Sequence, residues 1–247
     1  MTIFEPVLLA AVFFGVAILY SSVGNAGASG YLAVMALVGM APDVMKPTAL
    51  LLNIIVSVIA TIRFHQAGYF SWKIFWPFTL GSVPFAAVGG AVSVPGALYS
   101  ALVGLFLLVA ASRLLFYAGP ARRARRPLSL VAALLCGAGV GFLSGLTGIG
   151  GGILLSPLLL LAGWADARQS AGVASAFVLV NSVAATLGHV LVVGAAPRAI
   201  VLWGLAVALG GLVGAELGAR QLAEAALRRI LAVVLAIAGL KLLLVRS

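Results

Sequence analysis

Charged residues are scarce in this chain of 247 residues, because Asp, Glu, Lys and Arg together make up only 8% of it. An average globular domain has about 25% charged residues. A soluble domain of this length needs a charged surface, and this composition supplies too few residues to form one. The single Cys136 excludes an intrachain disulfide, and the strand alternation of outer-membrane barrels is missing. With soluble domains and membrane β-barrels excluded, the composition indicates a helical protein embedded in lipid.

Apolar sequence is what the chain has in abundance, at 64% hydrophobic residues. Windows of about 20 apolar residues, the length of a spanning helix, recur along almost the whole chain. We therefore expect an all-α, polytopic membrane helix bundle in the inner (plasma) membrane. Proline and glycine mark the boundaries of the expected helical segments, which are 7–24, 31–40, 47–65, 74–94, 97–117, 128–147, 152–163, 170–193, 197–218 and 224–245.

The net charge is +10, and the positions of the basic residues indicate that they orient the protein in a membrane. We do not expect nucleic acid as a partner. Basic residues lie at the ends of apolar segments, which is how orientation determinants are distributed. The densest group, Arg122 to Arg126, falls near the middle of the chain. We expect this linker, 121–127, to be cytoplasmic. It would separate a first membrane repeat, 1–120, from a second, 128–247, both embedded in the lipid bilayer.

Two glycine-rich segments support this division into related halves. The segment 23–30 reads VGNAGASG and the segment 145–152 reads GLTGIGGG. Each follows an apolar helix and precedes an apolar segment of about ten residues, which is too short to span a membrane. Transporters are often built from repeated halves whose broken helices occupy corresponding positions and mark the substrate site.

The relative orientation of the halves follows from the basic residues. If the broken segment of each half is a re-entrant hairpin, we expect inverted halves, with Arg220, Arg228 and Arg229 on the cytoplasmic side. If the broken segment completes a crossing, we expect parallel halves, with those arginines outside. Positive-inside counting favours inversion, which leaves mainly Lys46, Arg198 and Arg246 outside.

The two breaks predict a site for a small anion. Backbone that leaves a helix inside a membrane survives only where protein or a water-filled cavity covers it. Short helices beginning near Tyr31 and Ile153 would direct free amides and positive dipole ends into that cavity. The apolar segments around the breaks contain no charged side chain, so we expect an anion held without a buried lysine. The alternative is that the glycines only permit close helix packing.

Polar residues near the breaks and on two helix faces are the candidate binding residues. One helix presents Asn53 and Ser57, four residues apart and so on one face, and another presents a line of polar residues at seven-residue intervals. These lines either border a pathway or form interhelical hydrogen bonds. We expect no metal and no cofactor, and His189 is a candidate for a coupling proton. The substrate-binding candidates are Ser21, Ser22, Asn25, Ala28, Ser29, Gly30, Asn53, Ser57, Ser144, Thr147, Gly150, Gly151, Gly152, Ser175, Ser182 and His189.

The segments 20–30, YSSVGNAGASG, and 142–152, FLSGLTGIGGG, resemble the paired signatures of the TauE/SafE family of sulfite and organosulfonate exporters. The second segment is the closer match, because the first has Asn-Ala-Gly-Ala-Ser in place of the glycine-dense version. The duplication and the basic linker are similar as well, so the resemblance covers nearly the whole chain. It implies transport of small sulfur-containing anions.

Other functional classes share some of these features. An anion channel would use the same broken helices, although a repeated architecture favours a permease with alternating access. The Gly27-Ala-Ser-Gly30 pattern is that of rhomboid-type intramembrane proteases, with His65 or His189 as base. The equivalent position in the second half is Gly151, which favours a backbone role over an enzyme. The substrate, the direction of flux, the coupling ion and assembly into homodimers stay open.

Overall fold

The computed structural model describes residues 4–116, 127–190 and 200–220, and six positions near the C-terminus, 236–237, 239–240 and 243–244. The arginines of the central linker and most of the last expected helix, 224–245, lie outside the described residues.

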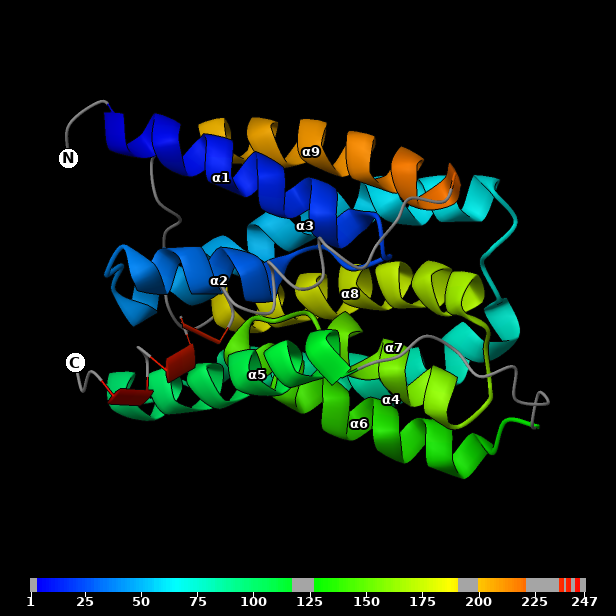
Figure 1. Ribbon diagram of the computed structural model, residues 1–247. Coiled ribbons are helices and arrows are strands. Elements are labelled where there is room, and N and C mark those ends of the chain that lie inside the picture. The colour runs from blue at the N-terminus through cyan, green and yellow to red at the C-terminus, as the bar shows by residue number, and fades with distance from the viewer. Residues whose placement is uncertain are drawn as a thin grey trace.

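The described part of the chain is all helical, as predicted, and the helices follow in the expected order (Figure 1). Two of them, α2 and α7, have ten residues each and follow the glycine-rich segments. The helices are α1 (Phe4–Ser21), α2 (Ala28–Leu37), α3 (Pro42–Gln66), α4 (Trp72–Ala91), α5 (Gly96–Phe116), α6 (Leu130–Thr147), α7 (Gly152–Leu161), α8 (Ala167–Val190) and α9 (Ile200–Arg220).

Glycines in left-handed backbone conformations interrupt the helices at both breaks. Gly24 and Gly27 have φ angles of 76° and 102°, and Gly148, Gly150 and Gly151 have φ angles of 80°, 83° and 79°. Residues with a side chain rarely adopt such angles, whereas glycine does so without steric cost. The breaks are therefore determined locally, by the glycine-rich sequence itself.

Each break turns the chain back inside the bundle. Helix α2 runs back alongside α1, toward the end of the bundle where α1 begins (Figure 1). The two helices touch through the edge-to-face rings of Phe13 and Tyr31, whose centroids are 5.3 Å apart. Helices α6 and α7 form the matching hairpin from the opposite end of the bundle. The chain thus places both breaks in the interior, between long helices.

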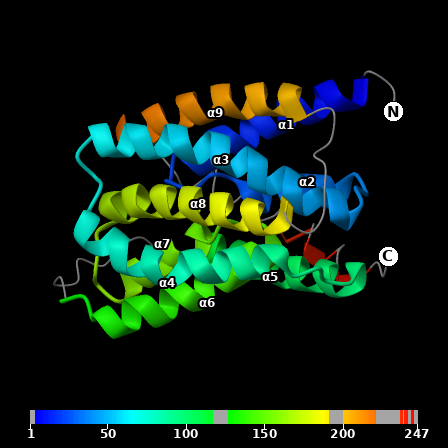
Figure 2. The same cartoon turned by 180° about the vertical axis from the view of Figure 1, so that it is seen from behind.

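The helices of 4–91 and those of 130–220 that hold the same place in chain order run in opposite directions. In Figures 1 and 2, α1 and α3 run one way, whereas α6 and α8 run the other way. The same holds for α4 and α9. The inverted relation of two repeated halves stays a prediction, with which these directions are compatible.

Small residues let the helices of the two halves pack closely. The most extensive contacts join α4 to α6 and α1 to α9, and α3 also packs against α8. A Cβ atom added at Gly141 of α6 would collide with the Ser82 carbonyl of α4, and one at Gly214 of α9 with the Ile18 carbonyl of α1. Close approach through small residues is typical of helix packing in membranes.

The outer surface of the bundle is apolar, as a protein in lipid requires. Five of the described helices are long and apolar enough to cross a membrane: Pro42–Gln66, Trp72–Ala91, Leu130–Thr147, Arg168–His189 and Ile200–Gly218. Large side chains such as Leu8, Leu80, Leu135 and Leu205 are more than half exposed on the bundle. Such exposure would be costly in water and is favourable in lipid. The chain is a multi-pass membrane protein, as predicted.

Basic residues gather at one end of the bundle. Arg63 at the end of α3 pairs with Glu216 near the end of α9, at 3.7 Å. The Arg168 guanidinium at the start of α8 donates a hydrogen bond to the Tyr69 hydroxyl, at 2.6 Å. The start of α4, with the exposed Lys73, lies three residues after Tyr69 in the chain. The ends of α3 and α9 and the starts of α4 and α8 therefore meet on one side.

We expect a side chain at Gly141 to separate α4 from α6. Gly141→Leu should lower the free energy of unfolding by about 1–3 kcal/mol through overpacking. The measurement is thermal unfolding of the purified protein in detergent. Gly139→Leu is the matched control, because a Cβ atom at Gly139 of the same helix meets nothing within 4 Å. Equal stability of the two variants would contradict the packing described for α4 and α6.

Candidate functional site

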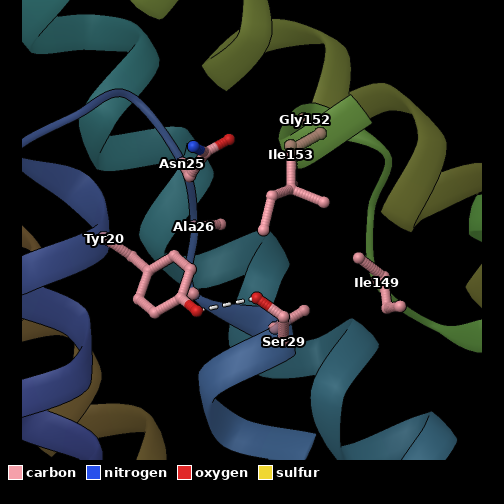
Figure 3. A pocket seen from close by; sticks show the side chains of 10 residues that line it. Tyr20, Asn25, Ala26, Ser29, Ile149, Gly152 and Ile153 are labelled. Atoms are coloured by element: carbon pink, nitrogen blue, oxygen red, sulfur yellow. Dashed lines mark hydrogen bonds between the residues drawn. The ribbon is translucent and has the colours of Figure 1, made fainter. Parts of the chain in front are cut away.

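The two breaks meet at one small pocket, which has a cavity volume of about 10 Å³ and is partly open. The first break contributes the run from Asn25 to Ser29, and the second contributes Ile149, Gly152 and Ile153 (Figure 3). Tyr20 from the end of α1 and Val178 from α8 complete the lining. Segments more than 120 residues apart in the chain thus form one small cavity, with no charged side chain in its lining.

Backbone amides without acceptors border this pocket. In α2 the hydrogen bonds begin with the Tyr31 amide, which donates to the Gly27 carbonyl at 2.9 Å. In α7 they begin with the Leu154 amide, which donates to the Gly151 carbonyl at 3.1 Å. No side chain caps either N-terminus. The amides just before Tyr31 and Leu154 therefore find no acceptor among the described residues, and two helix N-termini present partial positive charge to one cavity.

Asn25 supplies a polar side chain at the edge of this pocket. Its Oδ1 atom has no hydrogen-bond partner among the described residues. Figure 3 shows the side-chain amide directed toward Gly152 and Ile153, and a Cβ atom on Gly152 would lie 2.6 Å from Asn25 Oδ1. Asn25, predicted from the sequence, is therefore the side chain that connects the first break to the start of α7.

A pair of hydroxyls supplies a further donor. The Ser29 hydroxyl donates to the Tyr20 hydroxyl at 2.9 Å (Figure 3). Each hydroxyl carries one proton, so one O–H of this pair stays available to a third group. Sequence reasoning missed Tyr20 as a site residue, because a buried aromatic ring resembles a core residue. Its phenol, directly before the glycine-rich break, was the signal that could have identified it.

Helices α3 and α8 place further polar groups beside the second break. Asn53 Nδ2 donates to the Ser182 hydroxyl at 3.4 Å, which links the two predicted polar faces. A Cβ atom on Gly150 would lie 2.7 Å from Asn53 Nδ2. Within the described residues, Asn53 Oδ1 and the Ser144 hydroxyl have no hydrogen-bond partner. Glycine at position 150 therefore brings the polar faces of both helices against the backbone of the break.

Several predicted residues are directed away from the pocket, toward helix backbones. Their hydroxyls donate to carbonyls: Ser21 to Gly211 at 3.2 Å, Ser22 to Leu19 at 2.8 Å, Ser57 to Asn53 at 2.5 Å, Thr147 to Leu143 at 2.7 Å and Ser175 to Gly172 at 3.0 Å. Gly30 packs against Val16 and Tyr20. The Ser21 bond joins α1 to α9, as the alternative interpretation expects, whereas the other four hydroxyls bond locally, to carbonyls three or four residues earlier in the chain.

Lys46 lies near the start of α3, at the opposite end of that helix from Arg63. Its expected place on the outer side of the membrane stays a prediction. Its side chain is only 6% exposed, and its ammonium group donates to carbonyls at the end of α4. Burial of this charge is possible because a helix C-terminus offers unpaired carbonyls that a cation can satisfy. Lys46 is nevertheless not part of the pocket lining.

His189 lies beside Lys46, apart from the pocket. The imidazole is 8% exposed and close enough to the Gly90 backbone and to Lys46 to interact with both. Its Nε2 atom has no hydrogen-bond partner within the described part of the chain. Asn181, which the sequence analysis did not single out, is also fully buried with Oδ1 unpaired among these residues. An amide side chain in an otherwise apolar stretch was the signal for it.

Comparisons with known proteins extend the resemblance seen in the breaks to nearly the whole chain. A family profile described as "Sulfite exporter TauE/SafE" matches residues 8–242. A protein of Sinorhizobium fredii (strain NBRC 101917 / NGR234), named "Probable membrane transporter protein y4hK", is 43% identical over 249 residues. That alignment covers 97% of this chain and 98% of the relative. No solved structure matches the chain.

We expect the pocket to admit small water-soluble reagents. In a Cys136→Ala background, Asn25→Cys should react with a small charged thiol reagent, because residue 25 lines the partly open cavity. Ser21→Cys should stay unreacted, because Ser21 is fully buried against α9. Mass spectrometry of the labelled protein measures both. An unreactive Asn25→Cys in folded protein would show that the cavity is closed to water.

Proposed function

The chain belongs to the TauE/SafE family of sulfite exporters, and from this premise we propose that it transports a small sulfur oxyanion or organosulfonate through the pocket between its two breaks. The observation that carries this proposal is the convergence of two uncapped helix N-termini on one cavity. Free amides at a helix N-terminus are the backbone's own anion site.

The chemistry of the lining supports an anion over other substrates. A cation would need carboxylates, and the pocket lining contains none. A large apolar substrate would need neither free amides nor the hydroxyl and amide groups of Tyr20, Ser29 and Asn25. Each helix end contributes only about 0.3–2 kcal/mol to anion binding. Affinity should therefore be modest, which suits a transporter that must release its substrate.

The arrangement of the halves supports an inverted repeat and alternating access. The pairing of α4 with α6 is matched by that of α9 with α1, and α3 packs against α8. Corresponding helices run in opposite directions (Figures 1 and 2). Transporters of this architecture alternate access by moving one part against the other around a fixed site. By the positive-inside rule, the end with Arg63, Lys73 and Arg168 would be cytoplasmic.

The protease interpretation finds no support in the contacts of Ser29. Its hydroxyl is bonded to Tyr20, and His189 interacts with Gly90 and Lys46. His65 is exposed near the end of α3, where its ring lies 5.6 Å from that of Phe70. The family and the relative are transporters by description, so the remaining alternative is an anion channel.

We expect the purified protein to bind small anions and to ignore cations and neutral analogues of similar size. The panel is sulfite, sulfate, thiosulfate and short sulfonates against choline and a neutral sulfone, measured by thermal shift and by calorimetry. Asn25→Ala should weaken anion binding by about ten- to a hundredfold, since a hydrogen bond to a charged group contributes about 1.5–3 kcal/mol. Ser22→Ala should bind as the parent does, because its hydroxyl bonds to Leu19.

Preference for a cation would overturn the proposed substrate class, and equal binding by Asn25→Ala would remove Asn25 from the site. Size is tested in the same panel. The cavity volume of about 10 Å³ is close to the space that a single water molecule needs, so the pocket must widen to admit any of these anions. Affinity should therefore fall as the organic part of the sulfonate grows.

Flux measurements separate a carrier from a channel. In proteoliposomes, we expect saturable uptake of labelled substrate that unlabelled substrate inside the vesicle accelerates, because alternating access couples the return step to a bound substrate. Linear, conductive flux without such acceleration would favour the channel. Gly152→Val is the inactive control, since even its Cβ atom would meet Asn25 and Val178.

A further inference from the structure

Three backbone carbonyls at the end of α4 converge on the ammonium group of Lys46. The Nζ atom lies 2.9 Å from the Gly90 oxygen, 3.2 Å from the Gly89 oxygen and 3.4 Å from the Val92 oxygen. Gly89 and Gly90 lie in the last turn of α4, and Val92 is its C-cap. Carbonyls at this position carry the negative end of the helix dipole and have no partner within the helix.

No carboxylate among the described residues is recorded in contact with this ammonium group. Asp43, on the preceding turn of α3, is exposed and Lys46 is 6% exposed. The titratable group that faces Lys46 from α8 is His189, and the neighbour from the second break is the backbone of Gly148. Burying an ammonium without a counter-charge is costly unless other groups replace its hydration. Carbonyl oxygens do this for dehydrated cations in channel filters.

We propose that the C-terminal end of α4 is a site for a small monovalent cation, which the ammonium group of Lys46 fills as a built-in cation. The oxygen distances suit an ammonium ion or a potassium ion. Lys46 reaches the site from α3, so the charge belongs to the protein and does not leave with each transport cycle. The site is separate from the anion pocket and does not depend on the proposed substrate.

The position of Lys46 connects this cation site to the second break. A Cβ atom on Gly148 would lie 3.2 Å from the Lys46 carbonyl oxygen and 3.4 Å from its Cγ atom. Gly148 directly precedes Ile149, which lines the pocket. The aliphatic part of the Lys46 side chain thus packs against the break, and its ammonium group binds the carbonyls of α4. Its charge holds α3, α4 and the break between α6 and α7 together.

Removing the side chain should turn the site into one for a free ion. Lys46→Ala removes the ammonium donor from the three carbonyls and leaves His189 beside that of Gly90, which is destabilising, and it opens space that a small cation can enter. Ammonium chloride at about 100 mM should then raise the unfolding temperature of this variant by on the order of 3 °C relative to choline chloride at equal ionic strength. Choline is too large for the site. The parent should show no such difference.

Three further variants test charge and position in the same assay. Lys46→Met fills the space without a charge, so it should be less stable than the parent and indifferent to ammonium. Lys46→Arg should keep most of the parental stability. Lys73→Ala, at the exposed start of α4, is the matched control and should respond to ammonium no more than the parent does.

The proposal is overturned if Lys46→Ala gains no stability from ammonium, or if Lys46→Met is as stable as the parent. If Lys46→Ala folds only with ammonium present, the proposal is supported. If it folds in neither salt, a Lys46→Met variant of lowered stability together with a stable Lys46→Arg supports the proposal, and failure of all three counts against it. The assay contains no anionic substrate, so its outcome is independent of the proposed function.

Discussion

A backbone amide or carbonyl inside a membrane needs a partner, and this requirement explains most of the architecture. Within the long helices the requirement is met by the helix itself. At the two glycine-rich breaks it is not, so the uncapped starts of α2 and α7 lie in the interior, covered by α3 and α8. Burial without a protein partner is tolerable only around a polar cavity. The pocket at Asn25 and Gly152 is that cavity.

Close packing of the halves follows from the same constraint. Lipid provides no hydrophobic drive between helices, so contact must come from van der Waals packing and hydrogen bonds. Glycines on α6 and α9 bring carbonyls of α4 and α1 into contact with the facing helix. This close approach leaves little room between helices, and it confines the empty space to the point where two breaks replace regular helix.

The C-terminal end of α4 presents unpaired carbonyls, which carry the opposite partial charge to the amides at the starts of α2 and α7. Where helix starts offer amides, this helix end offers carbonyls, and Lys46 satisfies three of them. The unpaired amides and the unpaired carbonyls therefore lie in different surroundings. The amides of α2 and α7 face a partly open cavity, whereas the carbonyls of α4 are paired with a cation that the chain itself provides. Gly148 lies between the two sites and touches Lys46.

The sequence by itself determined the membrane class, the order of the helices, the breaks and the family, because composition and the backbone freedom of glycine act locally. It also predicted Asn25, which belongs to a break. Only the tertiary structure decided which neighbouring side chains face the pocket. Ser21 turned to Gly211, 190 residues away, while Tyr20 met Ser29, and Lys46 turned inward to α4. These outcomes depend on the rotation of each helix against distant partners, and a local pattern contains no information about that rotation.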